Sequence, residues 1–176
     1  DIMPEPLYDQ PYVRRLAYQC SGYDAPLRAP CWVEMGEVYA KLHNYDARSV
    51  YHDCYEKSPT ETDGRSCYDK GIVVLATYPL PRTSQQLLDI CDPFVSSKEK
   101  YLGCLGSVFD AFMYYSPKFV ARGITLCESG KHEYTEECFR TLGGRLRQFV
   151  PSLAERQNLC NSAVEDYKKL CAMDNA

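Results

Sequence analysis

The stretch that decides the fold runs from Cys138 to Cys171 and reads CFRTLGGRLRQFVPSLAERQNLCNSAVEDYKKLC. Its first half carries apolar residues at helical spacing, namely Phe139, Leu142, Leu146 and Phe149. Pro151 then interrupts the pattern, because a proline inside a helix removes a backbone donor and clashes with the preceding turn. A second apolar stretch leads to Cys160. The segment therefore predicts a helical hairpin.

The same pattern recurs along the chain, because short and long spacings alternate between its ten cysteines. The cysteines are Cys20, Cys31, Cys54, Cys67, Cys91, Cys104, Cys127, Cys138, Cys160 and Cys171. Gaps of 11 to 13 residues alternate with gaps of 22 to 24, and every second cysteine from Cys31 recurs after 33 to 37 residues. A period of this length is typical of helix-turn-helix repeats. We expect an all-α fold of about four helical hairpins, one in each long gap, plus a C-terminal helix.

The breaker residues inside the long gaps place the hairpin turns at 43–46, 79–81, 116–117 and 151. Four of the short gaps are rich in Gly, Pro, Ser, Asp and Lys, so they predict surface connections between hairpins. The exception is 161–170, which contains neither Gly nor Pro. This segment favours a continuous helix running to Cys171.

That exception bears on how the cysteines pair. In a continuous helix Cys160 and Cys171 would lie roughly 16 Å apart, too far for a disulfide. We therefore expect bonds across the base of each hairpin and a bond that closes the chain end to end, although bonds between neighbouring hairpins fit the repeat nearly as well. The expected pairs are Cys31 with Cys54, Cys67 with Cys91, Cys104 with Cys127, Cys138 with Cys160, and Cys20 with Cys171.

Length and cysteine content indicate one disulfide-rich domain in an oxidising compartment. We expect this domain at 20–176, preceded by an extended N-terminal arm at 1–19 that contains three prolines. Cysteines in even number and at this density are typical of secreted proteins. The chain starts at Asp1 without an apolar leader, as a mature chain does after removal of its signal peptide. No apolar run is long enough to span a membrane.

Charge and motifs argue against several function classes. The formal net charge is −4, with acidic and basic residues interspersed, so no basic face for nucleic acid is expected. The three histidines, His43, His52 and His132, lack the spacing of a zinc site. No G-x-S-x-G string presents a serine nucleophile, and ten cysteines can all pair. The sequence predicts no catalytic residue, no metal ion and no cofactor.

One short string resembles an enzyme. His52-Asp53-Cys54-Tyr55 is similar to the His-Asp pair that secreted phospholipases A2 carry close to cysteines on a helix. Those enzymes also have a cysteine pair just before the histidine and a glycine-rich calcium loop upstream, whereas here 47–51 holds no cysteine and the segment before His52 has only isolated glycines. A phospholipase-type hydrolase is therefore a remote alternative.

Tyrosine is the composition outlier, with 15 residues against 6 Phe and 1 Trp. Tyrosine combines apolar area with a polar tip, so it is enriched at recognition surfaces. The pair Tyr114 and Tyr115 precedes a predicted turn and is the best candidate for contact with a partner, together with Tyr45 and Tyr51 beside the first turn. The alternative is that the tyrosines pack around a thin hydrophobic core and do not contact a partner.

Two strings resemble a known group of proteins. Leu88-Asp89-Ile90-Cys91 and Tyr101-Leu102-Gly103-Cys104-Leu105 are followed by a predicted helix to Cys127 and by Cys138. This pattern is similar to cysteine-rich helical proteins secreted by invertebrates, including the 27 kDa haemolymph glycoproteins of insects and nematode cysteine-rich secreted domains. The resemblance covers about the central third of the chain. It implies a secreted helical protein and supplies no catalytic residues.

These observations favour a secreted, non-enzymatic protein that presents a rigid helical surface to an extracellular protein partner, as a body-fluid, venom, salivary or host-directed factor does. The alternative is a carrier of a small hydrophobic ligand, comparable with insect odorant-binding proteins. In that case apolar residues of the predicted helices would line a cavity instead of packing shut. The candidate cavity residues are Phe109, Phe112, Met113, Phe119 and Phe149.

Overall fold

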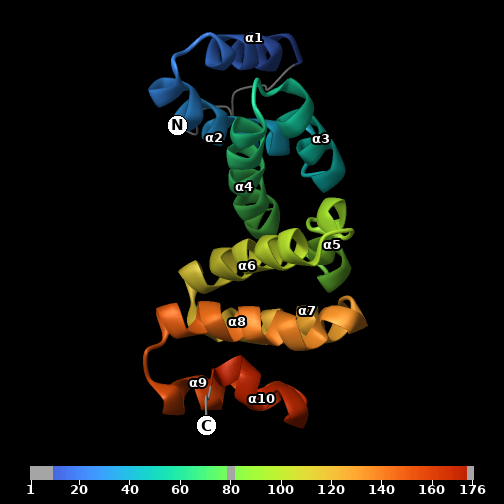
Figure 1. Ribbon diagram of the computed structural model, residues 1–176, viewed down its shortest axis with the longest axis vertical. Coiled ribbons are helices and arrows are strands. Elements are labelled where there is room, and N and C mark those ends of the chain that lie inside the picture. Colours follow the sequence, from blue (N-terminus) through green and yellow to red (C-terminus); the bar gives the residue numbers. More distant parts are fainter. Residues whose placement is uncertain (1–9, 79–81, 174–176) are drawn as a thin grey trace, which may run out of the picture. The chain divides into compact units, whose positions relative to one another are not determined.

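The computed structural model describes residues 10–78 and 82–173 (Figure 1). Over these residues the chain forms ten α-helices and four short 3-10 helices, with no strand. The all-α fold expected from the sequence is confirmed. The chain divides after Leu75 into two compact units. We call the described residues up to Leu75 unit 1 and those from Ala76 unit 2.

Unit 1 begins with a helix that the sequence interpretation missed. Its elements are α1 (Gln10–Ser21), α2 (Ala25–Leu42), α3 (Ala47–Lys57) and α4 (Glu61–Thr77), which continues into unit 2. The arm expected at 1–19 is wrong for 10–19, which are helical; 1–9 lie outside the described residues. Val13, Ala17 and Cys20 are the buried residues of α1, and their spacing places them on one face.

The first hairpin forms as predicted, from α2 and α3 with a turn between them. Asn44 and Tyr45 take the left-handed conformation there, with φ values of 49° and 62°. Asp46 then caps α3, because its carboxylate accepts a hydrogen bond from the backbone amide of Ser49 at 2.9 Å. Trp32 and Tyr39 of α2 are fully buried in the core of this unit.

Unit 2 contains the remaining helices and two further predicted hairpins. Its α-helices are α5 (Ser84–Leu88), α6 (Lys98–Tyr115), α7 (Val120–Ser129), α8 (Thr135–Phe149), α9 (Leu153–Leu159) and α10 (Glu165–Ala172). Its 3-10 helices are Asp92–Phe94, Pro117–Phe119, His132–Tyr134 and Cys160–Ser162. The turns expected at 116–117 and 151 separate α6 from α7 and α8 from α9. The turn expected at 79–81 lies outside the described residues.

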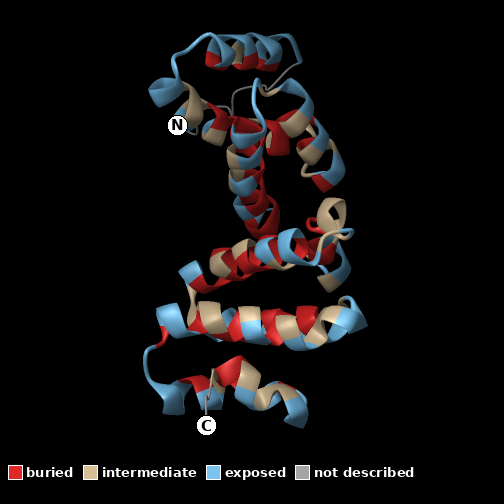
Figure 2. Ribbon diagram, viewed as in Figure 1, coloured by how far each residue is buried: buried red, intermediate tan, exposed pale blue. Residues whose placement is uncertain are grey.

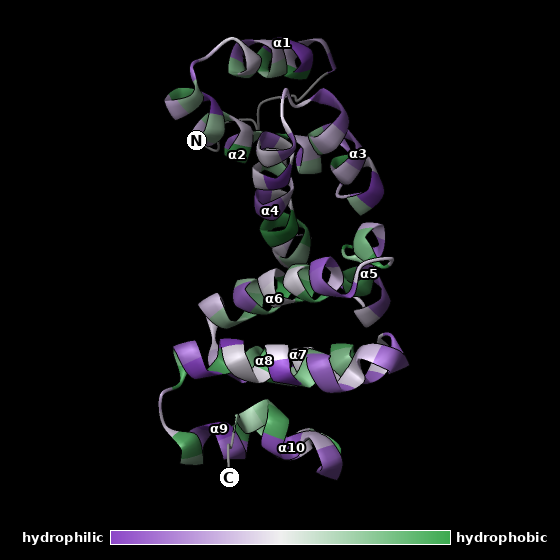
Figure 3. Cartoon of the chain, viewed as in Figure 1, coloured by the Kyte–Doolittle hydropathy of each residue, from purple (hydrophilic) through white to green (hydrophobic). Residues whose placement is uncertain are grey.

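The core of unit 2 is built around α6 and α8, which pack against each other. Buried residues recur along both helices, as Figure 2 shows, and α8 also packs against α7 and α10. Phe139 of α8 stacks on Tyr167 of α10, with ring centroids 4.7 Å apart. Figure 3 shows polar and apolar residues alternating around these helices, which is the pattern of amphipathic helices that bury one face.

The disulfides contradict the expected wiring. They join Cys20 to Cys31, Cys54 to Cys67, Cys91 to Cys104, Cys127 to Cys138 and Cys160 to Cys171. Each bond spans a short gap and links consecutive helical segments. All ten cysteines are bonded, and none is free to act as a nucleophile. Five disulfides are typical of a protein from an oxidising compartment.

The wiring prediction failed because 161–170 is not one continuous helix. After the 3-10 turn Cys160–Ser162, Ala163 and Val164 are extended, with ψ values of 153° and 142°. The chain reverses there and α10 starts at Glu165. The Cα atoms of Cys160 and Cys171 are consequently 5.8 Å apart, an ordinary separation for a disulfide.

A buried arginine holds this last turn in place. Arg156 of α9 is almost completely buried and donates hydrogen bonds to the backbone carbonyls of Val150, Pro151 and Ala172, at 2.9, 2.6 and 2.7 Å. Buried charges are tolerated when they are hydrogen-bonded in this way. Arg156 thereby ties α10 to the segment between α8 and α9.

Candidate functional site

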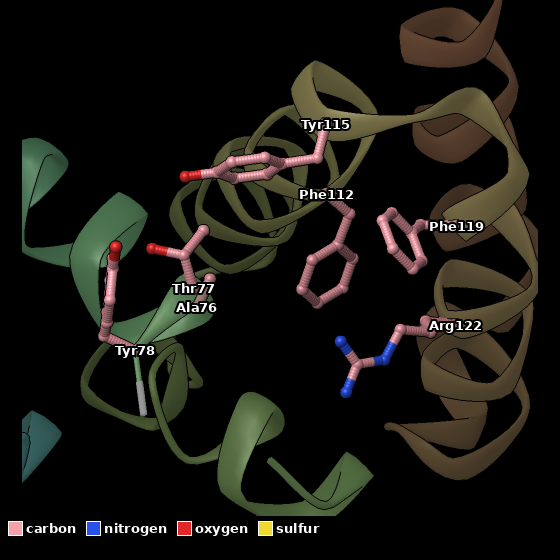
Figure 4. A pocket seen from close by; sticks show the side chains of 7 residues that line it. All are labelled: Ala76, Thr77, Tyr78, Phe112, Tyr115, Phe119 and Arg122. Atoms are coloured by element: carbon pink, nitrogen blue, oxygen red, sulfur yellow. The ribbon is translucent and has the colours of Figure 1, made fainter. Parts of the chain in front are cut away.

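The candidate site is a pocket in unit 2 where the end of α4, the end of α6 and the start of α7 meet (Figure 4). Its volume is about 430 Å³, within the range of roughly 300–1,000 Å³ found for small-molecule sites. The pocket is lined by Ala76, Thr77, Tyr78, Phe112, Tyr115, Phe119 and Arg122. Its wall is almost entirely apolar.

The local sequence explains how the aromatic residues reach the pocket. Helix α6 ends at Tyr115, and Ser116 then starts a 3-10 turn by accepting a hydrogen bond from the backbone amide of Lys118 at 3.3 Å. The chain re-enters a helix at Val120. This tight connection brings Phe119 beside Phe112, and Figure 4 shows their two rings on the same side of the pocket, with the Tyr115 ring above them.

Arg122 supplies the charged group of the pocket. Its Nη2 donates a hydrogen bond to the backbone carbonyl of Arg82 at 3.2 Å. Its guanidinium carbon lies 5.2 Å from the centroid of the Phe112 ring, a cation–π distance. The pocket therefore combines a largely apolar wall with one positioned cation, the composition expected of a small-ligand site.

The structure brings together only some of the residues that the sequence suggested for a cavity. Phe112 and Phe119 line the pocket. Phe109 and Met113 are 0% and 1% exposed and belong to the packed core, while Phe149 is 38% exposed. None of these last three lines this pocket.

The candidate contact tyrosines fall into two groups. Tyr114 and Tyr115 are 80% and 63% exposed, and Tyr115 also lines the pocket. Tyr45 and Tyr51 are half-buried in unit 1, where the Tyr51 ring lies edge-on to that of Tyr68, with centroids 5.2 Å apart. Tyr51 therefore packs at the edge of the core, which is the alternative role of tyrosine considered in the sequence analysis.

Sequence reasoning missed Ala76, Thr77, Tyr78 and Arg122 as pocket residues. Ala76 to Tyr78 precede Phe112 by more than thirty positions, and nothing local indicates that the two segments meet. Arg122 stands alone in the sequence without a recognisable motif. The sequence offers one signal for Arg122 as a pocket residue. It is a single arginine on a hydrophobic helix face close to a predicted turn.

A second, more polar depression lies in unit 1 and contains the His52-Asp53 pair noticed in the sequence. His43, Arg48, Ser49, His52 and Asp53 line it. Nε2 of His43 forms a hydrogen bond with Oδ2 of Asp53 at 2.8 Å, and Nδ1 of His52 lies 3.5 Å from Oδ1 of the same carboxylate. Asp53 is buried, whereas His52 is largely exposed.

The other polar groups of this cluster are engaged in further contacts. The backbone amide of Ser49 donates a hydrogen bond to the carboxylate of Asp46, at 2.9 Å. Asp53 is occupied by His43 and by Lys57, whose Nζ lies 2.7 Å from Oδ2. No group of His, Cys, Asp and Glu within residues 10–78 and 82–173 could hold a metal ion. The contacts describe an ion-pair network that ties α3 to the end of α2.

The contacts of Asp53 with Lys57 and His43 predict that the stability of the folded protein depends on pH in the acidic range. Burial alone would raise the pKa of Asp53, but hydrogen bonds from Lys57 and His43 lower it below its ordinary value of 3.8. The ionised carboxylate therefore stabilises the folded state above the unfolded pKa, and this contribution is lost as the pH falls through the lower native pKa. We expect Asp53→Asn to destabilise unit 1 by about 1–3 kcal/mol at neutral pH.

The difference between wild type and Asp53→Asn should disappear at pH values well below 3.8, where the wild-type carboxyl is neutral as well. Urea denaturation of both proteins across this pH range measures the difference. Glu56→Gln is the matched control, because Glu56 is exposed on the same helix. A difference that is independent of pH would contradict the ion-pair account.

Comparison of the chain with protein-family models, curated proteins and solved structures finds no match.

Proposed function

We propose that the protein is an extracellular carrier that holds a small apolar molecule in the pocket of unit 2. The observation that carries this proposal is the apolar pocket of about 430 Å³ walled by Phe112, Tyr115 and Phe119. Burying the apolar surface of a ligand against these rings removes it from water and provides the driving force. Tyr115 and Phe119 are partly exposed in the free protein, so a ligand would cover apolar surface that now faces solvent.

The extracellular setting is supported by the disulfides. Five bonds in a chain of 176 residues fit a protein that folds and works where thiols are oxidised. Among the described residues, no helix is both long enough and apolar enough to cross a bilayer. The bond Cys91–Cys104 anchors α6, and the bond Cys127–Cys138 joins α7 to α8, which supports a pocket that is preformed and loses little entropy on binding.

The neighbouring tyrosines at the end of α6 provide a matched test. Tyr115 lines the pocket, whereas Tyr114 does not, and both are exposed enough to be replaced without disturbing the core. We expect Tyr115→Ala to weaken binding of a neutral apolar dye, N-phenyl-1-naphthylamine, by about 1 kcal/mol, or roughly fivefold. Tyr114→Ala should leave the affinity unchanged.

Fluorescence titration of the dye measures both affinities, and Phe119→Ala provides an independent variant of the pocket wall. A carrier should bind the dye saturably with one site per chain. Absence of saturable binding to the wild-type protein, or equal loss in Tyr114→Ala and Tyr115→Ala, would contradict the proposal.

A second candidate function is recognition of a protein partner through the exposed tyrosines of unit 2. Tyr114 and Tyr115 lie edge to face, with ring centroids 5.8 Å apart, and both project from the end of α6. Aromatic residues in such exposed positions are typical of recognition surfaces. The same two variants separate the candidates, because a protein surface would depend on Tyr114, whereas the pocket depends on Tyr115.

A further inference from the structure

Among residues 10–78 and 82–173, no acidic side chain balances the positive charge of Arg122. A guanidinium has five N–H donors, and the structure records one hydrogen bond for Arg122, to the carbonyl of Arg82. Its other recorded contact is the ring of Phe112. Among the residues that the structure describes, no carboxylate forms an ion pair with Arg122.

Other arginines of unit 2 are differently placed. Arg140 pairs with Glu136 at 2.7 Å, and Arg145 pairs with Asp110 at 3.1 Å. Arg156, which is buried, is satisfied by three backbone carbonyls. Arg122 has neither arrangement, although it lies against an apolar wall where an unpaired charge is poorly solvated.

The guanidinium is also held in a defined position. Stacking against Phe112 and the hydrogen bond to Arg82 restrict the long side chain, and Figure 4 shows its nitrogens directed into the pocket beneath the rings of Phe112 and Phe119. Little side-chain entropy would be lost when the remaining donors meet a ligand. A planar fork of this kind suits carboxylate and phosphate oxygens.

The positive charge of Arg122 and the apolar lining of the pocket together indicate the class of ligand. We infer that the pocket takes an anionic amphiphile, with its carboxylate or phosphate head on the Arg122 guanidinium and its apolar chain against Phe112, Tyr115 and Phe119. The inference rests on the proposed carrier function and adds the class of ligand. The modest volume of about 430 Å³ favours a single chain of medium length.

The test compares ligands that share one chain and differ in the head group. Decanoate, decyl phosphate and 1-decanol are titrated against the full-length protein by displacement of the neutral dye. We expect both anions to bind the wild-type protein about tenfold more tightly than 1-decanol, because a charge-assisted, bidentate contact is added. The ratio of decanoate to decyl phosphate affinity identifies the preferred head group.

Arg122→Met removes the charge while keeping an unbranched side chain against Phe112. We expect it to lower the affinity for both anions about tenfold and to leave the affinity for 1-decanol unchanged. Arg147→Met is the matched control for loss of one positive charge, because Arg147 is exposed on α8 and lies outside the pocket. It should behave like the wild type.

The outcomes separate the inference from the function on which it rests. Wild-type affinities for decanoate and for decyl phosphate that are both no tighter than the affinity for 1-decanol would overturn the anionic class while the carrier function stands. Failure of all three compounds and of the dye to bind would overturn the carrier function itself. The wild-type comparison needs no variant, so the inference can be refuted even if Arg122→Met does not fold. Equal loss for decanoate and 1-decanol in a folded Arg122→Met protein would also overturn it.

Discussion

Reduction of all five disulfides is expected to unfold the protein at neutral pH without added denaturant. Each bond links cysteines 11 or 13 residues apart and contributes roughly 3 kcal/mol in the chain-entropy model. Their combined contribution is comparable with the whole stability of a typical domain, about 5–15 kcal/mol. Several of the helices are also too short to persist alone, among them α5, α9 and α10.

Far-UV circular dichroism of the reduced and alkylated protein measures this loss. Protein treated with the alkylating agent alone is the control, because it has no free cysteine and should be unaffected. A reduced protein that keeps its helical signal and a cooperative thermal transition would show that packing, and not the disulfides, maintains the fold.

Gly143→Ala is expected to destabilise unit 2 by about 1–3 kcal/mol or more, the range for overpacked cores. A Cβ at Gly143 would lie 2.3 Å from the carbonyl oxygen of Leu170 and 2.7 Å from that of Cys171. These are backbone atoms beside a disulfide, so they cannot move aside cheaply. The glycine is what allows α8 and α10 to approach so closely.

The next residue in the same helix is a matched control. A Cβ at Gly144 would meet no atom within 4 Å, so Gly144→Ala should stabilise the protein by about 0.5–1 kcal/mol through the higher helix propensity of alanine. Urea denaturation of both variants measures the contrast. Two substitutions with the same sign and size would show that the close contact of α8 with α10 is not required.

The hairpin pattern could be predicted from the sequence because helix periodicity and turn breakers are local signals. The turn at 43–46 and the breaks at 116–117 and 151 appear where polar residues or proline interrupt apolar stripes. The helix at 10–21 was overlooked because the prolines at 4, 6 and 11 suggested an extended arm, although Val13, Ala17 and Cys20 already had helical spacing.

The disulfide pairing could not be predicted because one local detail decides it. Ala163 and Val164 interrupt the helix without Gly or Pro, so the chain reverses where continuity was expected. The acidic pair Glu165 and Asp166 was a usable signal, since acidic residues are favoured in the first turn of a helix. That turn brings Cys171 next to Cys160 and allows the short-gap bond that a continuous helix would exclude.

Only some of the pocket residues could be predicted from the sequence. Phe112 and Phe119 could be proposed because both belong to apolar stripes beside a predicted turn. The same reasoning could not separate them from Phe109, which is fully buried, because periodicity identifies a face but not which of its residues face a cavity. Arg122 becomes informative only in three dimensions, where no carboxylate of the described residues pairs with it.

The most direct test of the carrier function is an NMR titration of isotope-labelled protein with 1-decanol, a neutral ligand that does not depend on Arg122. The account predicts saturable shifts concentrated at the backbone amides of 76–78 and 112–122, with the amides of unit 1 unchanged. Shifts that centre on unit 1, or that spread evenly over the chain without saturation, would contradict it.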